Sequence, residues 1–108
     1  MEITIILILI WIHWVADFVL QSDMMAQNKN KNNYWLVFHA FVYGICFLGV
    51  GFIFSFIIFM SHFAIDFVTS RVNSKLYNKN KIHYFFTSIG FDQALHITIL
   101  ITLYQYLN

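Results

Sequence analysis

The chain has 108 residues, of which 60% are hydrophobic, 20% are aromatic and 10% are charged, and its formal net charge is +1. In soluble domains roughly a quarter of the residues are charged, because a largely apolar exterior aggregates in water. The composition therefore excludes an ordinary water-soluble domain, and the small number of basic residues argues against nucleic-acid binding. We expect an all-α integral membrane bundle that forms a single transmembrane domain over residues 1–108.

The first apolar segment, residues 3–22, is predicted to be a transmembrane helix that is retained in the protein. No basic stretch precedes it and no small-residue cleavage site follows it, as would be expected for a secretory signal peptide. It also contains two ionisable residues, His13 and Asp17.

The middle apolar segment, residues 34–70, is too long for a single span. As one helix it would be about 55 Å long, whereas the hydrocarbon core of a bilayer is roughly 30 Å thick. Gly44, Gly49 and Gly51 lie near its middle, and glycine tolerates the backbone angles of a tight turn. We therefore predict a hairpin at the last two glycines, with a rather short helix before it that Asn32 or Asn33 would cap.

A third apolar segment completes the bundle, and two polar linkers, residues 23–33 and 71–81, separate the three segments. The chain is thus predicted to have four transmembrane helices, at about 3–22, 34–49, 52–70 and 84–107.

The basic residues predict the orientation of the bundle in the membrane. They are confined to the two polar linkers: Lys29, Lys31, Arg71, Lys75, Lys79 and Lys81. Short loops rich in lysine and arginine stay on the cytoplasmic side of the membrane. An inner-membrane location is therefore expected, with both basic loops in the cytoplasm and both termini outside.

Three pairs of one histidine and one aspartate, each four residues apart, lie within the predicted spans: His13 with Asp17, His62 with Asp66, and Asp92 with His96. At this spacing both side chains share one face of a helix. The order is reversed in the last helix, which runs in the opposite direction to the other two, so the three aspartates are expected at one depth near the cytoplasmic ends. His39 is predicted at a similar depth.

Ionisable residues are costly in a bilayer, so they usually face the interior of a bundle and take part in function. We expect these side chains to form one intramembrane site, facing the cytoplasm: His13, Asp17, His39, His62, Asp66, Asp92 and His96. Gln21, Gln93 and Arg71 are candidates for a supporting shell around it.

Imidazole and carboxylate groups from facing helices are the ligands of zinc, manganese and iron sites in helical bundles. A bound metal can lower the pKa of its water toward ~7. The pattern therefore favours a metal-dependent hydrolase that acts at the membrane on a substrate the sequence does not identify.

Two other interpretations remain open at this stage. The same titratable groups suit a proton- or ion-coupled transport component, and because the chain is short this function would need a homo-oligomer or a partner membrane protein. Alternatively, the polar pairs hold together the helices of an accessory or structural subunit whose other partners are membrane lipids.

The polar positions also carry a family resemblance over nearly the whole chain. They are the segment His13-Trp-Val-Ala-Asp17 with Gln21 and Asp23, then His39, His62-Phe-Ala-Ile-Asp66, Arg71 and Asp92-Gln93-Ala-Leu-His96. The pattern resembles domain-of-unknown-function family 3307, a family of small bacterial and phage membrane proteins. This resemblance implies a multi-pass inner-membrane protein but no particular activity. A looser resemblance, to bacterial membrane-bound metal-dependent hydrolases, is an analogy in residue type.

Overall fold

The computed structural model describes residues 2–107, and in this range the chain is entirely helical apart from short connections. Its elements in chain order are α1 (Ile3–Trp14), the π-helix η1 (Val15–Val19), α2 (Asp23–Asn28), α3 (Asn33–Ile45), α4 (Phe52–Asn78) and α5 (Ile82–Leu107). The prediction of an all-α fold is therefore confirmed.

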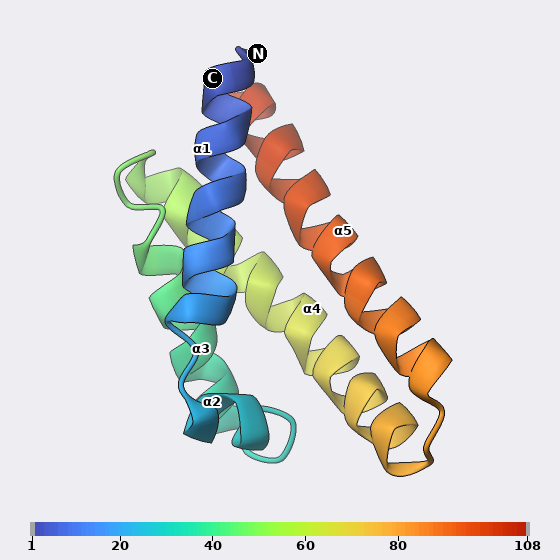
Figure 1. Cartoon of the computed structure of the whole chain (residues 1–108). Helices are drawn as coiled ribbons and strands as arrows, with labels where there is room; N and C mark the ends of the chain where they lie inside the picture. Colours follow the sequence, from blue (N-terminus) through green and yellow to red (C-terminus); the bar gives the residue numbers. More distant parts are fainter. Residues whose placement is uncertain (1, 108) are drawn as a thin grey trace.

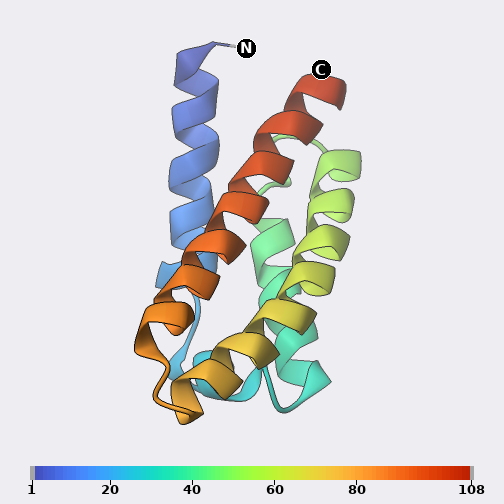
Figure 2. The ribbon, with the colours of Figure 1, turned by 90° about the vertical axis from the view of Figure 1, so that its right-hand side faces the viewer.

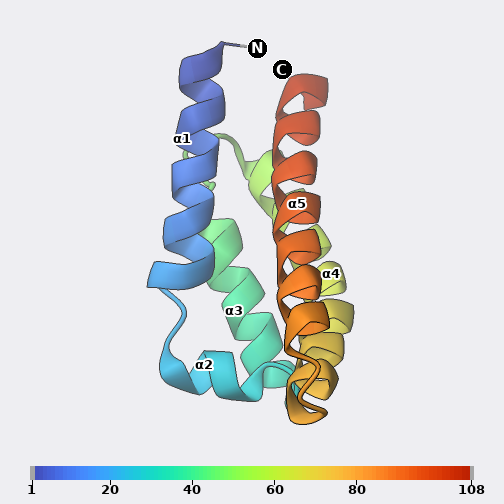
Figure 3. The same cartoon turned by 45° about the vertical axis from the view of Figure 1, so that its right-hand side comes forward.

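The helices run up and down in a bundle with both chain ends at one end and the polar connections at the other (Figure 1). We call the end that holds α2 and the α4–α5 turn the polar end. The central element is α4, which packs against both α3 and α5. α1 lies beside α5, and α3 rises along only the lower part of the bundle (Figures 2 and 3).

The first predicted helix, residues 3–22, is shorter and less regular than expected. It ends near Leu20, and its last turn is a π-helix in which the Leu20 N–H donates to the Val15 carbonyl over 2.9 Å. Such a wider turn changes the direction in which side chains point and often occurs at functional sites. Asp17 lies in this turn and is buried.

The first polar linker, residues 23–33, contains a helix that the sequence analysis did not predict. Ser22 caps α2 by accepting a hydrogen bond from the Met25 N–H at 3.2 Å, and Asp23 lies in its first turn, where a negative charge is favourable. Further on, the predicted cap of the next helix is confirmed, since Asn32 accepts a hydrogen bond from the Tyr34 N–H at 2.8 Å.

The predicted hairpin after α3 is confirmed, but α3 ends at Ile45 and not at residue 49. A series of turns follows the helix, and Gly51, with φ of 156°, begins α4. Residues that carry a side chain rarely adopt such a backbone angle, so glycine is required at this position. The three-turn length of α3 explains why it reaches only part of the way along the bundle.

The third predicted helix ended at residue 70, whereas α4 continues to Asn78 through most of the second polar linker. Polar residues end an apolar stretch, but they do not end a helix unless glycine, proline or a competing cap intervenes. Here the change of direction comes at Asn80, which has φ of 58° and is a residue type that tolerates the left-handed conformation. The final predicted helix, 84–107, lies within α5.

Two helices, α4 and α5, are long and apolar enough to cross a membrane by length and composition, and Ile3–Val19 is a shorter apolar helix. Large apolar side chains are exposed along the helices, among them Trp11, Phe41, Phe56 and Phe91. Contiguous exposed apolar surface of this kind is unusual for a protein in water. The four-span prediction is therefore supported for two of its helices.

The buried interior changes character along the bundle. An apolar cluster fills the part nearer the chain ends: Leu9, Ala16, Tyr43, Phe47, Phe54, Ile58 and Leu100. One helical turn further toward the polar end, Leu9 is followed by His13 on α1, and Leu100 is preceded by His96 on α5. The apolar core thus gives way directly to a buried polar layer.

Candidate metal centre

All seven histidines and aspartates predicted from the sequence are in the interior, between 0% and 7% exposed: His13, Asp17, His39, His62, Asp66, Asp92 and His96. They come from α1, η1, α3, α4 and α5. The structure therefore brings these residues together as the spacing predicted, and six of the seven fall into two groups with the geometry of metal ligands.

The first group consists of Asp17, His39, His62 and Asp66, which each offer one ligand atom within 4.8 Å of the others. His39 Nε2 lies 2.9 Å from Asp17 Oδ1, 3.4 Å from Asp66 Oδ2 and 3.0 Å from His62 Nε2. His62 Nε2 in turn lies 3.2 Å from Asp66 Oδ2 and 3.5 Å from Asp17 Oδ1. Both imidazoles thus point at the same two carboxylate oxygens.

Five of the six separations among these atoms are close to those around a tetrahedral ion. Zinc bonds of ~2.0–2.1 Å to nitrogen and oxygen place neighbouring ligand atoms about 3.3 Å apart. The five separations given above range from 2.9 to 3.5 Å. Little movement would be needed for the four atoms to hold one ion.

The orientation of the His62 ring is set by packing. The ring stacks against Tyr43, at 3.9 Å between ring centroids, and against His96, at 4.2 Å. Nδ1 of His62 and Nδ1 of His39 have no hydrogen-bond partner among the described residues. Nε2 therefore makes the polar contacts of both rings, and it points into the four-atom group.

The second group consists of Asp17, Asp92 and His96, and it shares Asp17 with the first. His96 Nε2 lies 3.2 Å from Asp92 Oδ1 and 3.1 Å from Asp66 Oδ1. Asp92 Oδ1 also accepts a hydrogen bond from the Thr69 hydroxyl at 2.6 Å. The carboxylates of Asp17 and Asp66 thus link the two groups.

His13 is the one predicted ligand that lies outside both groups, because both of its ring nitrogens have other partners. Gln93 donates through Nε2 to Asp17 Oδ2 at 3.2 Å and to Asp92 Oδ2 at 3.1 Å. Its Oε1 is then free to accept from His13 Nε2 at 2.6 Å, which leaves His13 Nδ1 to accept from the Tyr43 hydroxyl at 2.7 Å. His13 thus orients Gln93, and Gln93 holds two of the carboxylates.

Of the three residues predicted to support the site, Gln93 forms hydrogen bonds to two of its carboxylates and Arg71 forms none. The Arg71 guanidinium donates to the Phe67 carbonyl and to Asn33 Oδ1, at the surface of the bundle. Its position about one turn beyond Asp66 allowed a pairing, but Arg71 points away from the interior. Gln21 lines a cavity beside the cluster.

Lys29 is the residue of the site that the sequence analysis did not predict, because a lysine in a polar linker is expected to be solvated. The short helix α2 brings its Nζ to 3.3 Å from Asp66 Oδ2, and its side chain is 19% exposed. It is the single lysine or arginine that pairs with a carboxylate in residues 2–107. The three buried carboxylates lie close to this ammonium group and to the imidazoles, and carboxylate and imidazole groups together are a ligand set for a metal ion.

The comparisons with known proteins identify a family and nothing closer. The family described as "Protein of unknown function (DUF3307)" matches residues 5–108. The chain belongs to this family. No curated protein and no solved structure matches it.

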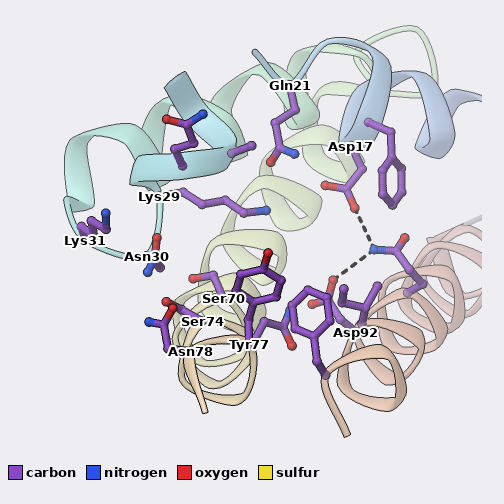
Figure 4. Close-up of a pocket in the computed structure, with 17 residues that line it drawn as sticks. Asp17, Gln21, Lys29, Asn30, Lys31, Ser70, Ser74, Tyr77, Asn78 and Asp92 are labelled. Atoms are coloured by element: carbon purple, nitrogen blue, oxygen red, sulfur yellow. Dashed lines mark hydrogen bonds between the residues drawn. The ribbon is translucent and has the colours of Figure 1, made fainter. Parts of the chain in front are cut away.

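In this DUF3307 protein a cavity of about 620 Å³ lies beside the two groups at the polar end. Asp17 and Asp92 line it, and Gln93 joins their carboxylates by the two hydrogen bonds drawn in Figure 4. Both groups therefore reach the cavity through Asp17, and the second group also reaches it through Asp92. The second group offers three ligand atoms, the number of protein ligands that catalytic zinc sites commonly have.

Proposed function

We propose that this DUF3307 protein is a membrane protein that binds a divalent transition metal, zinc, manganese or iron, and uses it in hydrolysis. The observation that carries the proposal is the four-atom group. Asp17, His39, His62 and Asp66 come from three separate elements, are almost completely buried, and each direct one ligand atom at a common centre.

A metal accounts for this arrangement better than hydrogen bonding alone. An imidazole Nε2 carries at most one hydrogen and makes one good hydrogen bond through it. Here the two Nε2 atoms lie 3.0 Å apart and both approach the same two carboxylate oxygens. One cation at the centre would be a partner for all four atoms.

Hydrolysis is supported by the second group, Asp17, Asp92 and His96, because both of its aspartates line the cavity. A divalent metal held there could activate water and polarise the bond to be broken. The protein's own contribution is positional: Gln93 and Thr69 hold the carboxylates by hydrogen bonds, and the buried surroundings limit the access of bulk water.

A location in the inner membrane is supported by the apolar helices α4 and α5 and by the exposed apolar surface. Both basic segments lie at the polar end, which we propose faces the cytoplasm because short basic loops remain on that side. The cavity would then open at the cytoplasmic face of the membrane.

The experiment that tests the proposal is elemental analysis of detergent-purified protein. Wild-type protein is expected to contain a near-stoichiometric transition metal, and Asp66→Asn and His62→Ala are each expected to lose most of it, since each removes a ligand of the four-atom group. Asp23→Asn is the matched control, because Asp23 is an exposed aspartate in α2 outside both groups. Its metal content should equal that of the wild type.

Two results would contradict the proposal. One is wild-type protein that is free of metal and does not take up added zinc or manganese. The other is unchanged metal content in both ligand variants after correct insertion has been verified.

A second candidate function, a proton relay, is favoured by one observation. A continuous series of imidazole and carboxylate groups runs from Asp17 through His39, Asp66 and His96 to Asp92, and titratable groups in contact can pass protons. The two candidates differ in one measurement. A pH-driven proton flux through metal-free protein in proteoliposomes would favour the relay if His96→Ala removes it.

A further inference from the structure

The cavity at the polar end has a lining that the metal groups do not explain. It lies between η1, α2, the second half of α4 and the start of α5, and polar side chains from these elements point into it (Figure 4). Its volume of about 620 Å³ is within the range of small-molecule sites, ~300–1,000 Å³. The lining is rich in amide and hydroxyl groups, which suits a ligand that forms many hydrogen bonds.

Three buried polar atoms in the lining have no hydrogen-bond partner among the described residues: Gln21 Oε1, Ser70 Oγ and Asn73 Oδ1. Ser70 is 7% exposed. Leaving such a group unsatisfied costs ~1–3 kcal/mol, so the site favours a ligand that supplies the missing partners. Two of the three atoms only accept hydrogen bonds, so the ligand must carry O–H or N–H donors.

The charges in the lining describe the rest of the ligand. Lys29 and Lys31 come from the turn after α2. Lys29 extends into the cavity and Lys31 lies at its edge, while Asp17 and Asp92 lie across it (Figure 4). An anionic group suits the lysines, but two carboxylates would repel it unless a cation lies between. A metal ion held by the second group, which contains both aspartates, would be that cation.

We propose that the cavity binds a phosphate ester whose alcohol part carries free hydroxyl groups. The phosphate lies between the lysines and the Asp17–Asp92–His96 group, and the hydroxyls donate to Gln21, Ser70 and Asn73. This inference rests on the proposed function, for which it names the substrate class. The same chemistry occurs in a lipid headgroup and in a soluble polyol phosphate, and the experiment distinguishes these sources.

The test uses two lipids of equal charge and equal acyl chains, phosphatidylglycerol and phosphatidylmethanol, which differ in the headgroup hydroxyls. Metal-loaded protein in a neutral detergent is given both at equal mole fraction, and the bound lipids are counted by native mass spectrometry. About tenfold more bound phosphatidylglycerol is expected, because two additional hydrogen bonds to buried acceptors are worth about this factor. Addition of free glycerol phosphate shows whether a soluble ester displaces the lipid.

Matched variants test whether the cavity causes the preference for phosphatidylglycerol. Ser70→Ala and Asn73→Ala should each reduce it severalfold without changing metal content, since neither residue belongs to a metal group. Ser61→Ala is the control, because Ser61 also lies on α4 but its hydroxyl donates to the Ile58 carbonyl and it does not line the cavity. Its preference should equal that of the wild type.

Equal retention of the two lipids by the wild type, together with no binding of glycerol phosphate, would overturn the inference, as would a preference that persists in both Ser70→Ala and Asn73→Ala. Metal content is measured on the same samples. Protein that holds metal but shows no preference refutes the phosphate ester alone, whereas protein that takes up no metal refutes the proposed function.

Discussion

Lys29 occupies the position at which the cavity meets the four-atom group. Its ammonium lies 3.3 Å from Asp66 Oδ2, and the same oxygen lies 3.2 Å from His62 Nε2. An ammonium group and a metal ion would compete for this oxygen, and their positive charges repel each other at short range. Lys29 is therefore an internal cation that binding of a metal would displace toward the cavity.

We expect Lys29→Met to raise the affinity for zinc or manganese about tenfold, or ~1.4 kcal/mol, as measured by competition with a chromophoric chelator in detergent. Lys31→Met is the control, because Lys31 lines the same cavity but makes no ion pair with a carboxylate in the described part of the chain. A weaker metal affinity in Lys29→Met would instead mean that the lysine holds Asp66 in its ligating position.

The ligand-type residues of the site could be predicted from the sequence, whereas their supporting contacts could not. A histidine and an aspartate at i, i+4 in an apolar helix have few explanations, because lipid does not solvate them. Lys29 and Tyr43 are ordinary residues in their own segments. Their roles depend on contacts with His13, Asp66 and other residues at least 30 positions away, which no local pattern encodes.

At the scale of the elements, the contact between α3 and α4 is closest at Gly44. A Cβ atom added there would lie 2.8 Å from Phe59 Cβ and 3.3 Å from the Ser55 carbonyl oxygen. The Ser55 hydroxyl also donates to the Gly44 carbonyl at 2.6 Å. This approach positions His39 on α3 against His62 on α4, so the packing of two helices determines part of the ligand geometry.

We expect Gly44→Ala to destabilise the protein by ~1–3 kcal/mol, because the added methyl group forces two backbones apart. The measurement is thermal unfolding in detergent, followed by intrinsic fluorescence. Gly90→Ala is the control: Gly90 lies within α5, where an added Cβ meets nothing within 4 Å, and alanine is the better helix former. Equal unfolding temperatures for Gly44→Ala and the wild type would show that α3 and α4 can separate without cost.

The errors in the predicted elements are errors in helix ends and have a common cause. Hydropathy shows where a helix leaves an apolar environment, and this differs from where its backbone hydrogen bonds stop. α4 therefore continues past residue 70 to Asn78, and the polar linker before α3 contains α2. The extension of α4 and the presence of α2 together form walls of the cavity, so a prediction based on spans could not include the cavity.

At the scale of the whole molecule, the start of α1 and the end of α5 lie at one end, and α2 and the α4–α5 turn lie at the opposite, polar end (Figures 1 and 3). The basic residues belong to segments 23–33 and 71–81, which include these elements. This arrangement agrees with an even number of membrane crossings, although α3 has 13 residues and at ~1.5 Å per residue reaches only about 20 Å. A short helix of this kind can remain in a bilayer when longer neighbours surround it and its polar groups face inward.

We expect the chain ends outside and the polar end in the cytoplasm, and single-cysteine labelling tests this. In a Cys46→Ala background, which removes the one cysteine, Glu2→Cys and Leu107→Cys should react with an impermeant maleimide in spheroplasts, because both sites are exposed. Lys79→Cys, also exposed, should react only after lysis. If only Lys79→Cys is labelled before lysis, the orientation is the opposite of the one expected. If all three variants are labelled before lysis, a spanning bundle is excluded. The expected result would put the cavity at the inner leaflet, where a phosphate ester could enter from the cytoplasm or sideways from the lipid.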